Sequence, residues 1–178
     1  MLEKVEPIPG ASKYSAAIHN KPYEVTLSEL ESRYVELVVE KKIAYDREGG
    51  KVGNWKVGQM TKKKMLNSTG AELAFGKLFN VYVDFSRRYR SYDLRMPDGR
   101  SVDVKHTDQD RGRLIATLET AHKPIPDLFA LMVGEFPTFE FRGVIPGDIF
   151  ISEKNVADLG HGPCYAVDQS RLSLEVSW

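Results

Sequence analysis

The chain has 178 residues, of which 42% are hydrophobic and 28% are charged, as in one ordinary globular domain. Its 25 basic residues balance its 25 acidic residues, so it lacks the overall positive charge of many nucleic-acid-binding proteins and has only local basic clusters. No stretch approaches the roughly 20 apolar residues of a membrane helix, and the N-terminus lacks the apolar core of a secretion signal, so we expect a cytoplasmic protein without membrane contact. A single cysteine and four scattered histidines exclude an internal disulfide and the usual zinc-ligand spacings.

Residues 1–60 are predicted to form an N-terminal arm and helix that precede the main domain. Residues 1–25 contain three prolines and show no sustained period. Apolar residues then recur at helical spacing, at Leu27, Leu30, Tyr34, Leu37 and Val38. Thr26 and Glu29 resemble a capping box, so the pattern predicts a helix that continues to about Tyr45. Residues 46–60 contain four glycines and are predicted to be a loop.

The main domain is predicted to span residues 61–178, and its first helix is expected over about 70–79. An apolar stripe marks this helix, at Ala71, Ala74, Phe75, Leu78 and Phe79. Beyond it the period changes to two, which predicts strands over the segments 81–85, 91–96, 101–106, 114–118, 128–133 and 139–145. The fourth of these can equally be a buried helical segment. The chain is therefore predicted to be α/β (α+β), with an N-terminal helical extension.

The loop Pro97-Asp98-Gly99 determines how the second and third predicted strands pair. If only Asp98 and Gly99 formed the loop, Leu94 would face Asp103, and each face of the hairpin would mix apolar and charged groups. A three-residue loop with Gly99 in the left-handed conformation instead pairs Leu94 with Val102 and Asp93 with Asp103. This second register separates apolar from charged side chains, and we expect it.

The expected register places Asp93, Asp103 and Lys105 on one polar face of the hairpin. Two aspartates directly across a strand pair repel each other, and a divalent cation such as Mg²⁺ or Mn²⁺ would offset that repulsion. Lys105 stands two residues after Asp103, so its ammonium group can reach whatever the cation holds. An alternative interpretation is a solvated polar face on which Lys105 forms an exposed ion pair, worth about 0–1 kcal/mol.

Glu72 is a third carboxylate that can reach this face. On the helical wheel it lies about 90° from the centre of the apolar stripe, at the boundary where the helix packs on the sheet. Its alternative role is local, because Thr69 precedes it by three residues at the expected start of the helix. In that case Glu72 is simply the second residue of a capping box.

The order of these residues resembles a known superfamily. A helix glutamate, Glu72, is followed by a strand aspartate, Asp93, and ten residues later by Asp103-Val104-Lys105. This order resembles the PD-(D/E)XK nuclease superfamily of restriction endonucleases and many phage and repair nucleases, although Tyr92 replaces the proline of the superfamily's name. The resemblance covers about residues 65–150, and the C-terminal part is similar to small phage-type members. It implies a restriction-endonuclease-like fold, in which helices flank a mixed central sheet.

The resemblance also implies an activity and a set of site residues. It implies a Mg²⁺-dependent deoxyribonuclease that hydrolyses phosphodiester bonds, an endonuclease rather than an exonuclease, in which Mn²⁺ substitutes for Mg²⁺. Glu72, Asp93, Asp103 and the carbonyl of Val104 would hold the metal. Lys105 would position the nucleophile, and completes the catalytic set with the three carboxylates.

DNA is the expected partner, and a homodimer is left open. Two local basic clusters are candidates for contacts with backbone phosphates: Lys62, Lys63, Lys64, Arg87, Arg88 and Arg90. Two other classes of function compete with the nuclease interpretation. One is a catalytically inactive nucleic-acid-binding module of the same fold, and the other is a phage structural or interaction protein, for which the near-zero net charge would be natural.

Overall fold

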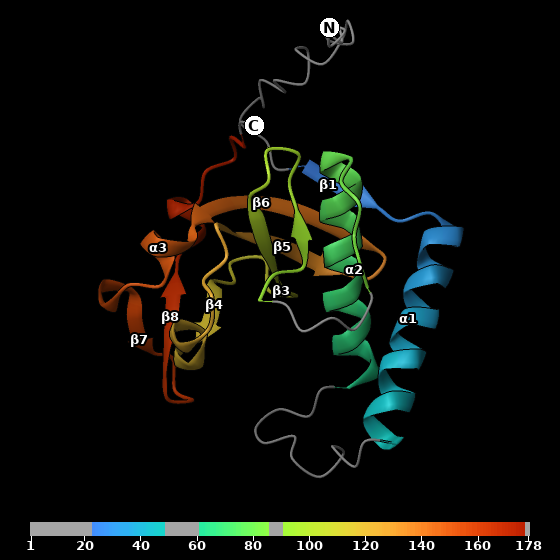
Figure 1. Ribbon diagram of the computed structural model, residues 1–178, viewed down its shortest axis with the longest axis horizontal. Helices are drawn as coiled ribbons and strands as arrows, with labels where there is room; N and C mark the ends of the chain where they lie inside the picture. The colour runs from blue at the N-terminus through green and yellow to red at the C-terminus, as the bar shows by residue number, and fades with distance from the viewer. Residues whose placement is uncertain (1–22, 49–60, 86–90, 177–178) are drawn as a thin grey trace, which may run out of the picture.

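The computed structural model describes residues 23–48, 61–85 and 91–176, which form a mixed α/β structure in three layers (Figure 1). A five-stranded sheet is the middle layer. Two long helices cover one of its faces, and a small three-stranded sheet with a short helix covers the other. The predicted α/β class with a mixed central sheet is confirmed. No helix in the described ranges is both long enough and apolar enough to cross a bilayer.

The five-stranded sheet has the order β1-β6-β5-β3-β2. Its strands are β1 (Tyr23–Thr26), β2 (Leu94–Arg95), β3 (Ser101–Thr107), β5 (Leu128–Glu135) and β6 (Thr138–Pro146). β3 and β5 run parallel and the other neighbours run antiparallel. β5 has the middle place in this order, and its first six residues are all buried because both faces of the sheet are covered. This burial accounts for the continuous apolar run LFALMV in the sequence.

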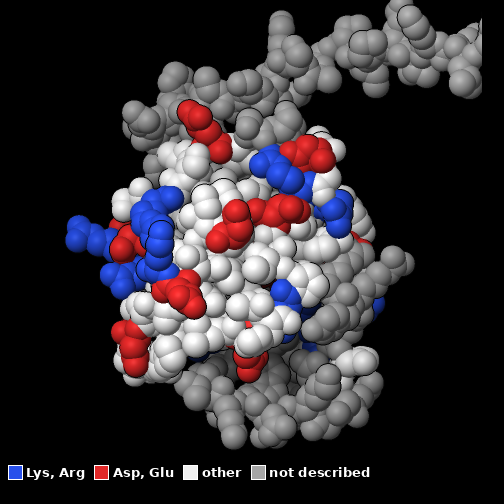
Figure 2. Space-filling model, turned by 60° about the vertical axis from the view of Figure 1, so that its left-hand side comes forward, with Lys and Arg blue, Asp and Glu red and all other residues white. Residues whose placement is uncertain are grey.

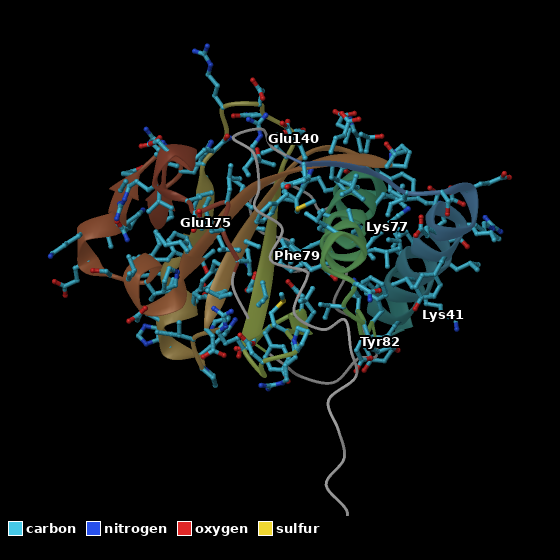
Figure 3. The ribbon with its side chains drawn as sticks, turned by 90° about the horizontal axis from the view of Figure 1, so that it is seen from above. Lys41, Lys77, Phe79, Tyr82, Glu140 and Glu175 are labelled. Carbon is cyan, nitrogen blue, oxygen red and sulfur yellow. The ribbon has the colours of Figure 1, made fainter. Side chains whose placement is uncertain are left out.

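Two helices, α1 (Glu29–Glu48) and α2 (Lys62–Phe79), form the helical layer. α2 lies between α1 and the sheet (Figures 1 and 3). It packs against the sheet through aromatic side chains. The ring of Phe141 on β6 lies 5.9 Å from that of Phe75 and 5.2 Å from that of Phe79, centroid to centroid. Edge-on aromatic contacts of this kind each contribute about 0.5–1.5 kcal/mol beyond the burial of area.

The opposite face of the sheet is covered by an antiparallel three-stranded sheet of order β4-β8-β7. Its members are β4 (Leu114–Thr117), β7 (Val156–Asp158) and β8 (Pro163–Val167), accompanied by the short helix α3 (Gly147–Phe150) and the 3₁₀ turns η2 (Leu118–His122), η3 (Glu153–Asn155) and η4 (Gln169–Arg171). Phe129 of β5, Phe150 and Tyr165 pack together in this second core. β4 and η2 occupy the connection between the parallel strands β3 and β5.

α1 turns a different face to the protein from the one that the sequence predicted. Leu30 is 83% exposed, and Tyr34 and Leu37 are exposed as well, whereas Val35 and Val39 are fully buried. The helix has two apolar stripes, and the one that contains the β-branched Val35 and Val39 packs against α2. Its capping box is also shifted, because the N–H of Ser28 donates to Glu31 and the N–H of Glu31 donates to Ser28. The prediction of Thr26 and Glu29 as the capping pair was wrong.

α2 begins eight residues earlier than predicted. Thr61 is its N-cap, and its hydroxyl accepts the N–H of Lys64 at 3.2 Å. The added turns bury Asn67 and Thr69, whose polar side chains hid the helical period from an apolar count. After α2, the predicted strand over 81–85 is reduced to a single bridge between Val83 and Leu94.

Four of the other predicted strands are confirmed, and the described residues 23–48 contribute to the same layers as the rest. The segments 101–106, 128–133 and 139–145 are strands, and 114–118 is the strand β4 rather than a helix. β1 pairs with β6, and α1 packs on α2. The described part of the predicted N-terminal extension is therefore continuous with the main sheet and its helical layer.

Candidate functional site

The hairpin of β2 and β3 has the register that the sequence predicted. Leu94 pairs with Val102, and the N–H of Met96 donates to the carbonyl of Arg100 at 2.7 Å. Between them the three-residue turn 97–99 places Gly99 at φ 92°, in the left-handed region that a glycine adopts without strain. Asp93, one residue before β2, is therefore brought to the level of Asp103, as the register requires.

The carboxylate of Asp93 is held in place by the backbone of β3. The N–H of Asp93 donates to the carbonyl of Val102 at 2.9 Å, and Oδ2 of Asp93 accepts the N–H of Val104 at 2.7 Å. The N–H of Val104 is thus bonded to a side chain and not to the backbone of the neighbouring strand, and β2 begins only at Leu94, three residues after the predicted start at 91. Since the N–H and C=O of one strand residue point to the same edge, the carbonyl of Val104 also faces Asp93.

Asp103 and Lys105 project from β3 on the face opposite to Val102 and Val104. The Nζ of Lys105 lies 2.6 Å from Oδ1 of Asp103, and these side chains are 33% and 16% exposed. The ammonium group of Lys105 also lies 6.0 Å from the ring centroid of Phe129. The pair is therefore partly shielded from solvent, which distinguishes it from the exposed surface pair of the alternative interpretation.

Glu72 lies in the middle of α2, and the capping-box alternative for it is wrong. Thr69 is an interior residue of a helix that begins at Lys62, so it has no cap to share with Glu72. Burial and then the negative charge of Asp93 raise the pKa of the Glu72 carboxyl to about 8. The Glu72 side chain keeps some exposed surface, but its carboxyl group is largely screened from water.

The pKa of the Asp93 carboxyl is also raised. Burial and then the charge of Asp103 raise the pKa of Asp93 to about 6, against the hydrogen bond from Val104. Glu72, Asp93 and Asp103 are therefore within electrostatic range of one another, and we call them the carboxylate cluster. The cluster lies at the edge of the sheet where β2 begins, so a group from the helical face can approach groups from the opposite face.

The carboxylate cluster has the donor chemistry of a site for a hard divalent cation. Carboxylate oxygens are the ligands that Mg²⁺ and Mn²⁺ prefer. Burial, and after it the charge of a neighbouring carboxylate, raises the pKa of Glu72 and Asp93, and a bound cation would offset both effects. Within residues 23–48, 61–85 and 91–176, no three Asp, Glu, His or Cys side chains already stand as a metal-binding group. Asp103 is turned toward Lys105 and Asp93 toward the N–H of Val104.

The basic residues predicted to contact DNA are placed away from the cluster or outside the described ranges. Lys62, Lys63 and Lys64 form the first turn of α2, about 12–15 Å along the helix axis from Glu72. Lys62 pairs with Glu40 and Lys63 with Glu135, both at the surface. Arg87, Arg88 and Arg90 lie outside the described residues. On the face that Figure 2 shows, basic and acidic side chains are mixed.

The sequence analysis missed one residue of the site, Lys42 of α1. Its positive charge lowers the pKa of both Glu72 and Asp93, against the larger effect of burial. Its signal in the sequence was a lysine in register with the buried Val35 and Val39, seven and three residues earlier. This signal is hard to recognise in the sequence, because α1 has a second apolar stripe that is exposed in the structure.

The raised pKa values predict that metal-free protein loses stability as the pH rises. Between pH 4.5 and 8, folded Glu72 binds more protons than unfolded Glu72, so the free energy of unfolding falls with pH in this window. Asp93 has the same sign between pH 3.8 and about 6. Urea unfolding in EDTA from pH 4.5 to 8.5 measures this. Glu72→Gln should be about 1–3 kcal/mol more stable than wild type at pH 8, with a flatter profile.

The matched control for this prediction is Glu153→Gln, which removes an exposed carboxylate. It should follow the wild-type profile. A wild-type profile for Glu72→Gln itself would place Glu72 in an ordinary solvated environment and remove it from the cluster.

No protein-family model matches the chain, and no curated protein matches it. A function for this protein is therefore inferred from the carboxylate cluster, Lys105 and Lys42.

Proposed function

We propose that this protein is a metal-dependent nuclease that hydrolyses phosphodiester bonds in DNA, and that its fold is restriction-endonuclease-like. The observation that carries the proposal is the meeting of Glu72 from α2 with Asp93, Asp103 and Lys105 from the β2–β3 hairpin. Three carboxylates gathered beside a lysine, two of them with raised pKa values, form an arrangement that a purely structural role does not explain. The order of the same residues along the chain resembles the PD-(D/E)XK pattern.

Asp93, Asp103 and Glu72 would hold Mg²⁺ or Mn²⁺, together with the carbonyl of Val104. When bound, such an ion polarises a phosphoryl oxygen and activates water for attack. The hydrogen bond from Val104 to Asp93 fixes one carboxylate before any ligand arrives. A preorganised carboxylate has less conformational freedom to lose on binding.

Lys105 is the residue that would act on the substrate. Its ammonium group is at hydrogen-bonding distance from Asp103, which holds it at the cluster. From there it can donate a hydrogen bond to a non-bridging phosphoryl oxygen, or orient the attacking water, and its charge opposes the negative charge that develops during displacement. In this role Asp103 positions the lysine as well as supplying an oxygen ligand.

DNA is the proposed partner, through contacts that are independent of base sequence. Lys64 is exposed at the start of α2, and Lys62 and Lys63 are exposed beside it in surface ion pairs. Such pairs contribute about 0–1 kcal/mol, so phosphates can compete for these lysines. We propose this first turn of α2 as a phosphate contact outside the reacting centre.

A second candidate is a nucleic-acid-binding module of the same fold that lacks the chemistry. The observation that favours it is the Lys105–Asp103 ion pair, because a lysine that serves only as the counter-ion of an aspartate needs no substrate. The two candidates differ in what a divalent metal does to the protein, and in whether DNA is cut.

The proposal is tested by incubating the full chain with linear DNA and with closed circular DNA, in EDTA, Mg²⁺ or Mn²⁺. We expect cleavage in either metal and none in EDTA, with the circular substrate cut as an endonuclease would cut it. Millimolar Mn²⁺ should also raise the melting temperature, because it binds the folded state preferentially. If the protein binds DNA but does not cut it, and if metal does not change its melting temperature, the binding module is favoured instead.

A further inference from the structure

Lys42 stands where an amphipathic helix normally has an apolar residue. Val35 and Val39 are fully buried on the inner face of α1, and Ile43 packs against the same core. Lys42 follows Val39 by three residues and Val35 by seven, so it belongs to this inner face. A charged residue that breaks the apolar pattern of a packed helix face marks a strained or functional position.

The ammonium group of Lys42 is held against α2 at the level of the carboxylate cluster. Its Nζ donates to Oγ1 of Thr69 at 3.0 Å, and Thr69 is only 1% exposed. Thr69 precedes Glu72 by three residues, so the two lie on the same side of α2. The ring of Phe85 lies 5.4 Å from the same nitrogen. Lys42 is thus an ordered, partly buried cation.

Lys42 reaches the cluster from α1, through its contact with Thr69 on α2, whereas Lys105 reaches it from β3, through its contact with Asp103. Burial and Asp93 raise the pKa of Glu72, and Lys42 lowers it more than Lys105 does. For Asp93 the order of the two lysines is reversed. The contact of Lys42 with Thr69, one helical turn before Glu72, places its charge beside Glu72, whereas Lys105 is paired directly with Asp103. The three carboxylates are balanced by two lysines from two different elements.

We propose that Lys42 is a positioning residue of the metal site, whose ammonium group serves as a built-in counter-ion that holds Glu72 in the cluster without metal. This inference rests on the proposed function in taking the cluster as a metal site. A fixed cation beside the ligands has two consequences. It lets three carboxylates fold together in metal-free protein, and it weakens the binding of a divalent ion, because the two positive charges repel each other.

The first measurement is the Mn²⁺ affinity of variants, by titration calorimetry with the metal alone at pH 8. Lys42→Met removes the charge and keeps an aliphatic side chain, and it should bind Mn²⁺ about 5–20-fold more tightly than wild type. Lys42→Arg keeps the charge and should bind like wild type. The control is Lys41→Met, because Lys41 is exposed on the outer side of α1 (Figure 3). Equal affinities for wild type and Lys42→Met would overturn the proposal.

The second measurement needs no metal, and so separates this proposal from the proposed function. In EDTA at a pH above 8, where Glu72 is ionised, Lys42→Met should lower the folding equilibrium constant about tenfold or more, and the same change in a Glu72→Gln background should have little effect. A role in packing alone would produce the same loss in both backgrounds, and would overturn the inference. If Lys42→Met does not fold, Lys42→Met/Glu72→Gln must fold. If wild type binds no Mn²⁺, the proposed function fails, and this cycle still decides the role of Lys42.

Discussion

Asp103→Asn should lower the rate of metal-dependent DNA cleavage by about 10³-fold or more, while the protein stays folded. The neutral amide removes one of the proposed metal ligands and also the partner that holds Lys105 at 2.6 Å. Both losses fall on the reacting centre, so we expect the effect in kcat rather than in the affinity for DNA. Single-turnover cleavage of a labelled duplex in Mn²⁺ measures it directly.

The stability of Asp103→Asn separates a functional from a structural aspartate. The variant loses a partly exposed ion pair, but it also relieves the repulsion that raises the pKa of Asp93. These two effects oppose each other, so the free energy of unfolding in EDTA should change by less than about 1 kcal/mol. Asp108→Asn, five residues further along and exposed, is the control and should retain full activity. A strongly destabilised Asp103→Asn would identify a structural ion pair instead.

Lys105→Met should lower kcat by about 10²–10³-fold and leave DNA binding in Ca²⁺ nearly unchanged. The methionine keeps the packing of the aliphatic part of the side chain near Phe129, and removes only the ammonium group. Because the lysine acts on a single phosphate, its share of the total binding energy is small. Quenched-flow cleavage measures kcat, and fluorescence anisotropy with the same duplex measures the affinity for DNA in Ca²⁺.

Two comparisons make this result specific. Lys123→Met removes an exposed lysine elsewhere on the chain and should behave as wild type. The double variant Asp103→Asn/Lys105→Met should be little worse than either single variant, since residues that act as one unit have strongly non-additive effects. Loss of DNA binding and cleavage together in Lys105→Met would mean that this lysine contributes general affinity and does not act on the reacting phosphate.

The parts of the site that could be predicted from the sequence depend on local rules. The register of the β2–β3 hairpin follows from one glycine and from the need to keep Leu94 and Val102 on the apolar face. The side chains of a strand alternate strictly, so placing Asp103 also placed Lys105. The central strands were recognisable for a similar reason, because a strand buried on both faces must be apolar throughout.

The errors came from elements whose sequence offered two local solutions. α1 has two apolar stripes, and only contact with α2 decides that Val35 and Val39 are buried while Leu30 is exposed. The start of α2 was missed because its first turns bury Asn67, whose Oδ1 accepts the N–H of Phe136, 69 residues away. The pattern of apolar residues along a helix cannot reveal a buried polar residue whose hydrogen-bond partner is so far away in the sequence.

The sequence by itself determined the mixed α/β class, the pairing that brings Asp93 level with Asp103, and the short spacing from Asp103 to Lys105. Only the tertiary structure decided that Glu72 is an interior helix residue near the hairpin, and that Lys42 reaches the same place from α1. The physical reason is the range of the forces involved. Turns and strand alternation act between close neighbours in the chain, whereas burial and charge act between groups that only packing brings together.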